Sequence, residues 1–190
     1  GKITLRGLIT RDPEALSSAT RFRLEVESPT PITEVTVRFS VVGQRAARYQ
    51  RVDISPSAGV QTDFLVRTDT FERYIPPGSD IRYFLEIQAE GGRELVTEPR
   101  LFTYLDARFD WQEEREGDLS ILYYGPTGSQ AQTMLDTMVL TLEDMQPLLG
   151  ITVERPIRLV MYNSVSDMLG ALPLVSETLR RQLVTQGQTH

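Results

Sequence analysis

The chain has 190 residues, of which 40% are hydrophobic and 24% charged, and its formal net charge is −6. This hydrophobic content is enough for a packed core and argues against a disordered chain. The acidic balance, with no basic patch along the sequence, argues against nucleic-acid binding. Cysteine is absent, so disulfides, thiolate metal sites and a cysteine nucleophile are excluded.

Histidine occurs once, as the last residue, His190. A Ser-His-Asp arrangement therefore has no internal base, and a zinc site has no pair of imidazole ligands. No apolar run approaches the roughly 18–20 residues of a membrane span, so no membrane-spanning segment is predicted. Because the sequence enters a strand-like pattern directly after Gly1, we expect a chain whose export leader has been removed.

Apolar and polar residues alternate along most of residues 22–104, which is the pattern of strands buried on one face. Examples are the runs 22–27, 34–41 and 81–88. Turn signals at Ser28–Pro31 and Pro76–Asp80 separate predicted strands, and Gly91-Gly92 suits a tight hairpin. About seven short strands in roughly 100 residues predict an Ig-like or fibronectin-like antiparallel β-sandwich over residues 1–105.

Residues 106–118 interrupt this alternation and are predicted to be a connector. The segment is charged but contains Phe109 and Trp111, which we expect to pack at the seam between two domains. Its acidic residues have the composition of a solvated charge run, which is favoured over a carboxylate site; they are Glu113, Glu114, Glu116 and Asp118.

Residues 119–190 predict an α/β unit in the order β-α-β-α-α. The strands are 119–124 and 157–162, and the helices are 129–149, one from Ser164 to Pro173, and 176–185. Two strands joined by a long helix should lie parallel. Because two strands are few for a stable α/β layer, we predict that this unit is incomplete.

The helix predicted at 129–149 carries an apolar stripe with Thr127 or Ser129 as its N-cap and Gly150 as its C′ residue. The stripe consists of Ala131, Leu135, Met138, Leu142, Met145 and Leu149. The helix contains three methionines, and core packing is favoured for them over a soft binding groove. In the next helix, Ser164 and Asp167 form a weak capping box, and the predicted buried face is Val165, Met168, Leu169 and Leu172.

Other candidate sites have weak patterns. Arg45, Arg48 and Arg51 form the one local basic cluster and are interpreted as solvated, with an anion or partner contact as the alternative. Three dispersed acids, Asp63, Asp69 and Asp80, lack the density of a calcium loop. The turn 124–129 lacks both a Gly-x-Ser-x-Gly elbow and the lysine of a phosphate-binding loop. No carboxylate pair for glycoside hydrolysis stands out.

Several segments resemble a bacterial exported family, the peptidase MA-like metallohydrolases of the gluzincin type. The segments are Tyr74–Ser79, Ile81–Tyr83, Asp106–Trp111, Glu154–Leu159 and Tyr162–Ser164. The resemblance implies an Ig-like domain followed by the start of the peptidase lobe. It also implies a zinc site on a later His-Glu-x-x-His helix, which residues 1–190 do not contain. No catalytic, cofactor-binding or metal residue is therefore assigned to this chain.

Two hypotheses remain open. In the first, the chain is the non-catalytic N-terminal region of an exported, extracellular or envelope-bound zinc metallopeptidase. Its partners would be the downstream peptidase lobe, and either envelope proteins or a protein substrate, with zinc bound only downstream. In the second, it is a stand-alone Ig-like binding or adhesion module without enzymatic activity. In this second hypothesis the α/β unit would be complete. If the unit is incomplete, a second copy of the chain could cover it in a homodimer.

Overall fold

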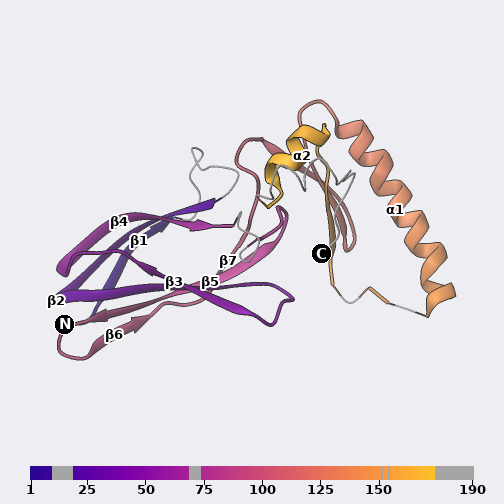
Figure 1. Cartoon of the computed structure of the whole chain (residues 1–190). Helices are drawn as coiled ribbons and strands as arrows, with labels where there is room; N and C mark the ends of the chain where they lie inside the picture. The colour runs from indigo at the N-terminus through magenta and orange to yellow at the C-terminus, as the bar shows by residue number, and fades with distance from the viewer. Residues whose placement is uncertain (10–18, 69–73, 151, 154, 174–190) are drawn as a thin grey trace. The chain divides into compact units, whose positions relative to one another are not determined.

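A computed structural model describes residues 1–9, 19–68, 74–150, 152–153 and 155–173. The chain divides into two compact units, Gly1–Ala107 and Arg108–His190. Within the described residues the first unit contains strands only, whereas the second combines a small sheet with two helices (Figure 1). The chain is thus a β-rich protein with a small helical part.

Seven strands of the first unit belong to one hydrogen-bonded antiparallel network. They are β1 (Thr4–Ile9), β2 (Ala19–Val41), β3 (Ala47–Val52), β4 (Ser57–Arg67), β5 (Asp80–Ala89), β6 (Arg93–Val96) and β7 (Arg100–Thr103). The hairpin predicted at Gly91-Gly92 is confirmed between β5 and β6, since both glycines have positive φ, 76° and 70°. Positive φ at both central residues is what a tight hairpin turn requires.

Strand β2 organises the first unit because its two halves pair with different strands. Residues 19–27 lie between β1 and β4, and residues 32–41 lie between β3 and β5. The prediction that Ser28–Pro31 separates two strands is therefore wrong: the segment stays extended and only shifts the pairing register with β4. Proline has no backbone N–H to donate, and its fixed φ is compatible with an extended chain, so Pro29 and Pro31 can lie where the pairing is interrupted while the strand continues.

A bulge explains why the buried positions of β2 change parity. Phe22, Leu24 and Val26 are buried at even positions, whereas Val35 and Val37 are buried at odd ones. The register with β5 shifts between residues 32 and 34, so one extra residue is inserted there. Because side chains alternate with period two, a single inserted residue returns the apolar side chains to the same core.

Both halves of β2 contribute to one core. Phe22 stacks on its cross-strand partner Phe64 with ring centroids 5.1 Å apart. It also meets Tyr83 of β5 at 5.3 Å and Phe102 of β7 at 6.1 Å, both edge-on. Strand β5 pairs with residues 32–41 of β2, and β7 pairs with β5. These ring contacts therefore join the strands around residues 19–27 of β2 to the strands around residues 32–41. The buried cluster extends from Ile3 to Tyr104.

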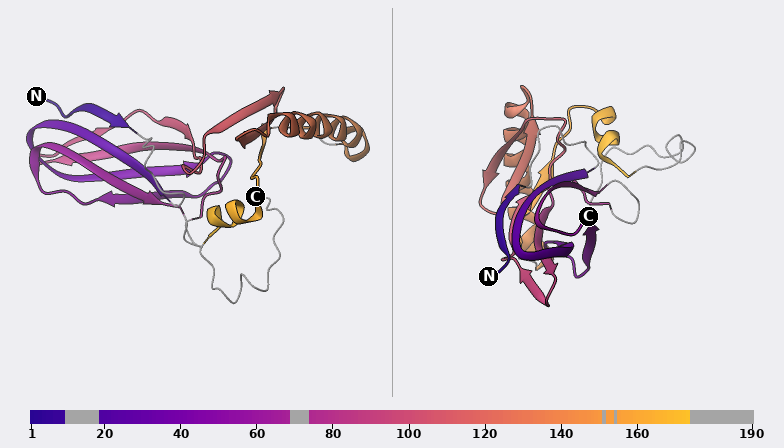
Figure 2. Two further views of the ribbon diagram at one scale, coloured as in Figure 1. Left: turned by 90° about the horizontal axis from the view of Figure 1, so that it is seen from above. Right: turned by 90° about the vertical axis from the view of Figure 1, so that its left-hand side faces the viewer.

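The second unit contains a three-stranded sheet in the order β10-β9-β8, with helix α1 alongside it (Figure 2). Its elements are β8 (Trp111–Glu116), β9 (Leu119–Tyr124), α1 (Gly128–Leu149), β10 (Ile157–Val160) and α2 (Val165–Ala171). The predicted parallel pairing is confirmed between β9 and β10. Every residue of β9 is buried, as a central strand covered on both faces requires.

Part of the predicted connector is a strand. Residues 111–116 form β8 and pair antiparallel with β9 around a turn at Gly117, whose φ is 56°. The charged side chains obscured this strand, because an edge strand can carry charge on its exposed positions. Phe109 and Trp111 were expected at a seam between domains. In the structure Phe109 stacks on Tyr124 of the second unit, and Trp111 meets the same ring edge-on.

Helix α2 follows the sequence signals in part. Ser164 is its N-cap, and the Ser164 side chain accepts a hydrogen bond from the Asp167 backbone N–H at 3.1 Å. Val165, predicted to be buried, is exposed, whereas Ala171 is the buried residue of this helix. Met168, Leu169 and Leu172 are half-buried, so the predicted buried face is confirmed in part. The helix predicted at 176–185 lies outside the described residues.

Candidate functional site: an apolar groove beside helix α1

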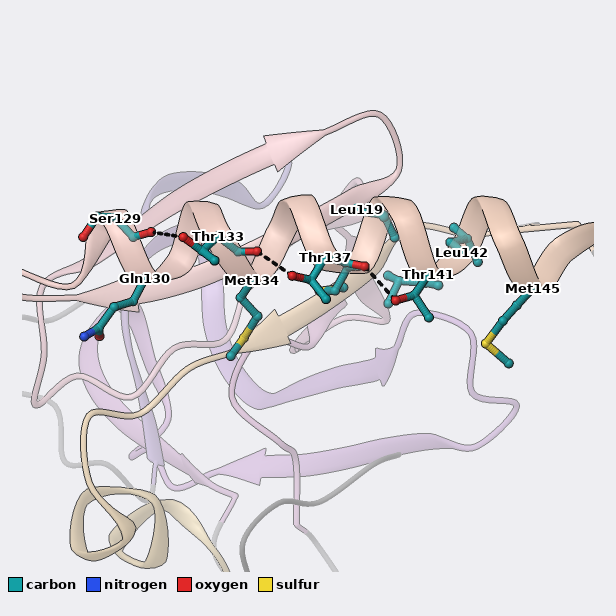
Figure 3. A pocket seen from close by; sticks show the side chains of 11 residues that line it. Leu119, Ser129, Gln130, Thr133, Met134, Thr137, Thr141, Leu142 and Met145 are labelled. Atoms are coloured by element: carbon teal, nitrogen blue, oxygen red, sulfur yellow. Dashed lines mark hydrogen bonds between the residues drawn. The ribbon is translucent and has the colours of Figure 1, made fainter.

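A groove of about 720 Å³ runs along one flank of α1 (Figure 3). Most of its lining comes from α1, namely Ser129, Gln130, Thr133, Met134, Thr137, Met138, Thr141, Leu142 and Met145. Leu119 of β9 and Ile157 of β10 complete it. In Figure 3 the side chains of Gln130, Met134 and Met145 point to the same side of the helix. All lining residues belong to the second unit.

The position of α1 leaves this flank open. Its buried residues, Ala131 and Leu135, pack with Leu119, Ile121 and Tyr123 of β9. The helix packs over the central strand β9 and the edge strand β8, and not over the other edge strand, β10. Ile157 and Leu159 of β10 are aligned with Leu119 and Ile121, so they face the same side as α1.

The face of β10 beside α1 is consequently bare. Ile157 and Leu159 keep 43% and 38% of their surface exposed, although equivalent positions of β9 are buried. A parallel sheet is normally covered by helices on its faces. The groove is therefore the place where a covering element is missing among the described residues.

Helix α1 extends beyond its core contacts. Its 22 residues span about 33 Å at 1.5 Å per residue, whereas a six-residue strand spans about 20 Å. Its second half consequently carries exposed apolar side chains, among them Leu140, Met145 and Leu148. The helix ends as predicted at Gly150, whose φ of 63° is left-handed.

The methionine prediction is only partly right. Met138 packs partly buried against the core of the second unit, as expected. All three methionines line the groove, but Met134 and Met145 are 40% and 45% exposed. The apolar stripe in the sequence does not show how much of the surface of α1 the neighbouring sheet covers. The alternative of a soft apolar surface therefore describes these two residues better.

The threonines of the groove add apolar surface. The hydroxyls of Thr133, Thr137 and Thr141 donate to the carbonyl oxygens four residues earlier, at 2.9, 2.8 and 2.7 Å (Figure 3). Because each hydroxyl is already bonded within the helix, the flank offers few free polar groups to an occupant. The groove thus suits an apolar partner surface better than a polar ligand.

A second cluster, which sequence reasoning did not identify, surrounds Tyr124 at the end of β9. Phe109 stacks on its ring with centroids 4.0 Å apart, and Trp111 and Tyr162 meet it edge-on. The Tyr124 hydroxyl donates to Asp167 at 2.8 Å and accepts from the Asn163 backbone N–H at 2.9 Å. These four aromatic residues come from three separate segments of the sequence. Their presence could have suggested an aromatic cluster, but only the fold shows that they are in contact.

The Tyr124 cluster holds α2 and the start of α1 in place. Thr127, the N-cap residue of α1, does not cap through its side chain as predicted. Its hydroxyl instead donates to the Tyr124 carbonyl at 2.8 Å. Arg108 donates to the Asp167 carbonyl at 2.7 Å and lies over the Phe109 ring at 4.9 Å. These partners are all within the protein, so the cluster is interpreted as structural.

The pKa values within this cluster are displaced in opposite directions. The hydrogen bonds from Tyr124 and with Ser164 hold the pKa of Asp167 below its ordinary value. Burial raises the pKa of the Tyr124 hydroxyl. A carboxylate whose pKa is lowered by folding stabilises the folded state above its unfolded pKa of about 3.9. That contribution disappears as the pH falls through the lower, folded pKa.

We therefore expect the contact between α2 and Tyr124 to weaken in acid, below about pH 4. Asp167→Asn should flatten the acid part of the pH dependence of unfolding, followed by fluorescence of the single tryptophan, Trp111, which packs on Tyr124 at 5.1 Å. Asp144→Asn, an exposed change on α1, is the matched control and should leave that dependence unaltered. Equal flattening by both variants would contradict the role given to Asp167.

The other predicted candidates are dispersed. Arg51 pairs with Glu34 at 3.2 Å, and Arg45 is exposed. Asp63 pairs with Arg23 at 3.0 Å and Asp80 accepts from Thr103 at 2.7 Å, whereas Asp69 lies outside the described residues.

The acids at 113–118 do not form one site. Glu113 pairs with Arg115 at 3.2 Å, whereas Glu114 accepts from the Tyr123 hydroxyl at 3.1 Å. Successive strand residues point to opposite faces, which separates these two carboxylates. Glu116 and Asp118 are exposed. Across the described residues, no three acidic, histidine or cysteine side chains gather as potential metal ligands. His190 lies outside this part of the chain.

Neither helix of the described chain has the length and apolar composition needed to cross a membrane. No protein-family model and no curated protein matches the sequence. The chain is similar to a solved structure described as "Myokine structure", with 8% identity and a TM-score of 0.41, covering 55% of this chain and 99% of that one. Another, "Crystal structure of Br derivative BhCBM56", has 13% identity, a TM-score of 0.34 and coverages of 54% and 91%. Similarity at this level carries no argument about function.

Proposed function

We propose that this chain is the non-catalytic N-terminal region of an exported bacterial zinc-metallopeptidase-like protein, in which it positions the catalytic lobe. The observation that carries the proposal is the bare apolar face of β10 beside α1, with Ile157 and Leu159 exposed. An apolar face of this kind is stabilised when further polypeptide covers it.

The open edge of β10 supports the same proposal. Among the described strands β10 pairs only with β9, so it is an edge strand of this sheet. Unpaired strand edges invite the addition of a strand. A peptidase lobe that continues this sheet would pair with β10 and cover Leu159. It would also supply the zinc ligands, which are expected downstream of this chain and not within it.

The first unit is proposed to be an Ig-like sandwich that contacts envelope proteins or the protein substrate. Seven antiparallel strands and the ring contacts of Phe22 across the two groups of strands support this fold. The alternative, a stand-alone binding module, expects a closed second unit without an exposed apolar sheet edge. The groove and the exposed residues of β10 favour the peptidase-like protein.

The experiment compares the chain as given with the longer product of the same gene. The codons after His190 are expected to encode a His-Glu-x-x-His segment soon. The longer protein should bind one zinc ion and cleave casein in a chelator-sensitive way, whereas residues 1–190 should not. A stop codon shortly after His190 would refute the proposal, as would zinc-dependent proteolysis by residues 1–190 alone.

A pair of variants tests whether β10 supports the catalytic lobe. Leu159→Asp places a charge on the bare face and should lower the activity of the longer protein about tenfold, because the charge loses its water when the lobe packs there. In residues 1–190 the same change should hardly alter the Trp111 unfolding transition, since Leu159 is already partly exposed. Val96→Asp, at an exposed site of β6, is the control and should leave the activity unchanged.

A further inference from the structure

We propose that the first unit binds an acidic, extended segment of a partner protein through three arginines, Arg45, Arg48 and Arg82, which form the arginine cluster. This contact rests on the proposed function and names the chemistry by which the first unit would recognise an envelope protein or a protein substrate. It involves the first unit alone, so the groove and the bare face of β10 remain for the catalytic lobe.

Strand pairing brings the three arginines to one end of the first unit. Arg45 lies in the connection between β2 and β3, residues 42–46. Arg48 of β3 is aligned with Phe39 of β2, and Arg82 of β5 is aligned with Ser40. Because β2 lies between β3 and β5 here, the backbones of Arg48 and Arg82 are about 10 Å apart, two strand spacings. Alternation along β2 places Arg82 on the outer face of the sheet and Arg48 on the inner one.

The arginine cluster has no partners within the protein. In the described part of the chain, every other arginine takes part in a hydrogen bond, an ion pair, a ring contact or another electrostatic contact. Arg51, for example, pairs with Glu34 at 3.2 Å. Arg45, Arg48 and Arg82 make no such contact with the described residues. Three unpaired positive charges are therefore concentrated at one end of a unit whose chain carries a net charge of −6.

Arg48 shows that solvation is not a full account of the cluster. Its side chain is half-buried, and its Nη1 atom is enclosed without a hydrogen-bond acceptor. Gln50, the next inward residue of β3, satisfies its amide by donating to the Leu65 carbonyl at 2.7 Å. An enclosed donor without an acceptor destabilises the protein, and more so when it is charged. A carboxylate bound to the Arg48 guanidinium would neutralise this charge and supply the acceptor.

The surroundings of the cluster favour a carboxylate-bearing peptide among anions. Asp80, the acid two residues before Arg82 on the same face, accepts from Thr103 at 2.7 Å. Val42 and Tyr49 are 48% and 67% exposed and offer apolar contacts beside the charges. A nucleic-acid backbone or an anionic membrane extends its charge far beyond about 10 Å, where the net negative chain would repel it. A short acidic segment with apolar side chains avoids that repulsion and matches the cluster in extent.

Fluorescence anisotropy of a labelled peptide tests the contact with residues 1–190. The probe has about twelve residues, with glutamate at every third position and two leucines between them. Since an extended chain rises about 3.3 Å per residue, successive glutamates lie about 10 Å apart, as Arg48 and Arg82 do. The control peptide has glutamine in place of each glutamate. The glutamate peptide should bind at least about tenfold more tightly, and its affinity should fall as salt screens the charges.

Substitutions within the cluster locate the binding site. Arg45→Gln and Arg82→Gln change exposed side chains and should each lower the affinity about threefold, as for exposed charge pairs. Arg48→Gln should lower it about tenfold, because its guanidinium is partly desolvated. Arg6→Gln is the matched control and should leave the affinity unchanged, since Arg6 already pairs with Glu27 at 2.8 Å. Circular dichroism of each variant confirms that the strands are folded.

Equal binding of the two peptides, or no binding of either, would overturn the proposal. So would a loss in Arg6→Gln as large as in Arg82→Gln, because the effect would then come from net charge alone. An oligonucleotide of the same charge that bound more tightly than the glutamate peptide would also overturn it and would assign the cluster to phosphates. The measurement needs neither zinc nor the downstream lobe. A stop codon after His190 would consequently remove the proposed function without altering peptide binding.

Discussion

Replacing Leu135 by alanine should lower the unfolding free energy of the second unit by about 3 kcal/mol, within the range found for leucine deletions in cores. Leu135 is 1% exposed and is the larger of the two buried α1 side chains in the cluster with β9. Its removal leaves a cavity in the buried cluster that Leu135 forms with Leu119, Ile121 and Tyr123 of β9.

Trp111 fluorescence during urea unfolding measures the effect, since this tryptophan packs on Tyr124 and Tyr162 of the second unit. Leu140→Ala, the same substitution on the same helix at a site 63% exposed, is the control and should change stability by less than about 0.5 kcal/mol. Similar losses in the two variants would show that α1 does not pack on β9 through Leu135.

Replacing Phe22 by alanine should lower the unfolding free energy of the first unit by about 4 kcal/mol. Phe22 is 2% exposed and touches three other rings, Phe64, Tyr83 and Phe102. Since these rings belong to strands on both sides of the core, the deletion removes contacts within one group of strands and between the two groups. Packing between aromatic rings adds to the loss of buried area.

Hydrogen exchange of peptides from β2 and β5 follows this unit, because Trp111 does not belong to it. Exchange should accelerate throughout both strands in Phe22→Ala. The Trp111 transition should hardly move, since each unit has its own buried cluster. Tyr49→Ala, the deletion of an exposed ring on β3, is the control and should have a small effect. A large shift of the Trp111 transition in Phe22→Ala would mean that the two units unfold together.

The elements of this protein were largely predictable because their periodicities are regular. Alternation gave most strands of the first unit, and the spacing of Ala131 and Leu135 gave the buried face of α1. Strand β8 was missed because Gln112, Glu113 and the charged residues after them carry no apolar alternation. Strand β8 is defined by its pairing with β9, and the sequence of an exposed edge strand need not show an apolar pattern that reveals such pairing.

The groove could be anticipated only in outline. Two strands and one long helix predicted an incomplete layer, whereas the described sheet has a third strand, β8, and Ile157 and Leu159 of β10 are exposed. Which methionines line the groove was not predictable, because that depends on the strands that α1 covers. Thr137 and Thr141 look polar in the sequence, yet their hydroxyls are bonded to the helix backbone. The Tyr124 cluster likewise required residues 109, 124 and 162 to be brought together by the fold.

By itself, the sequence determined the strand-rich first half, the parallel β-α-β order of the second and the scarcity of imidazole, since these follow from local periodicity and composition. Only the tertiary structure decided that β2 crosses between two groups of strands, that Trp111 packs on Tyr124 and that one flank of α1 is open. The physical reason is that burial is a property of neighbours in space. Periodicity identifies an apolar face, and the fold alone determines what covers it.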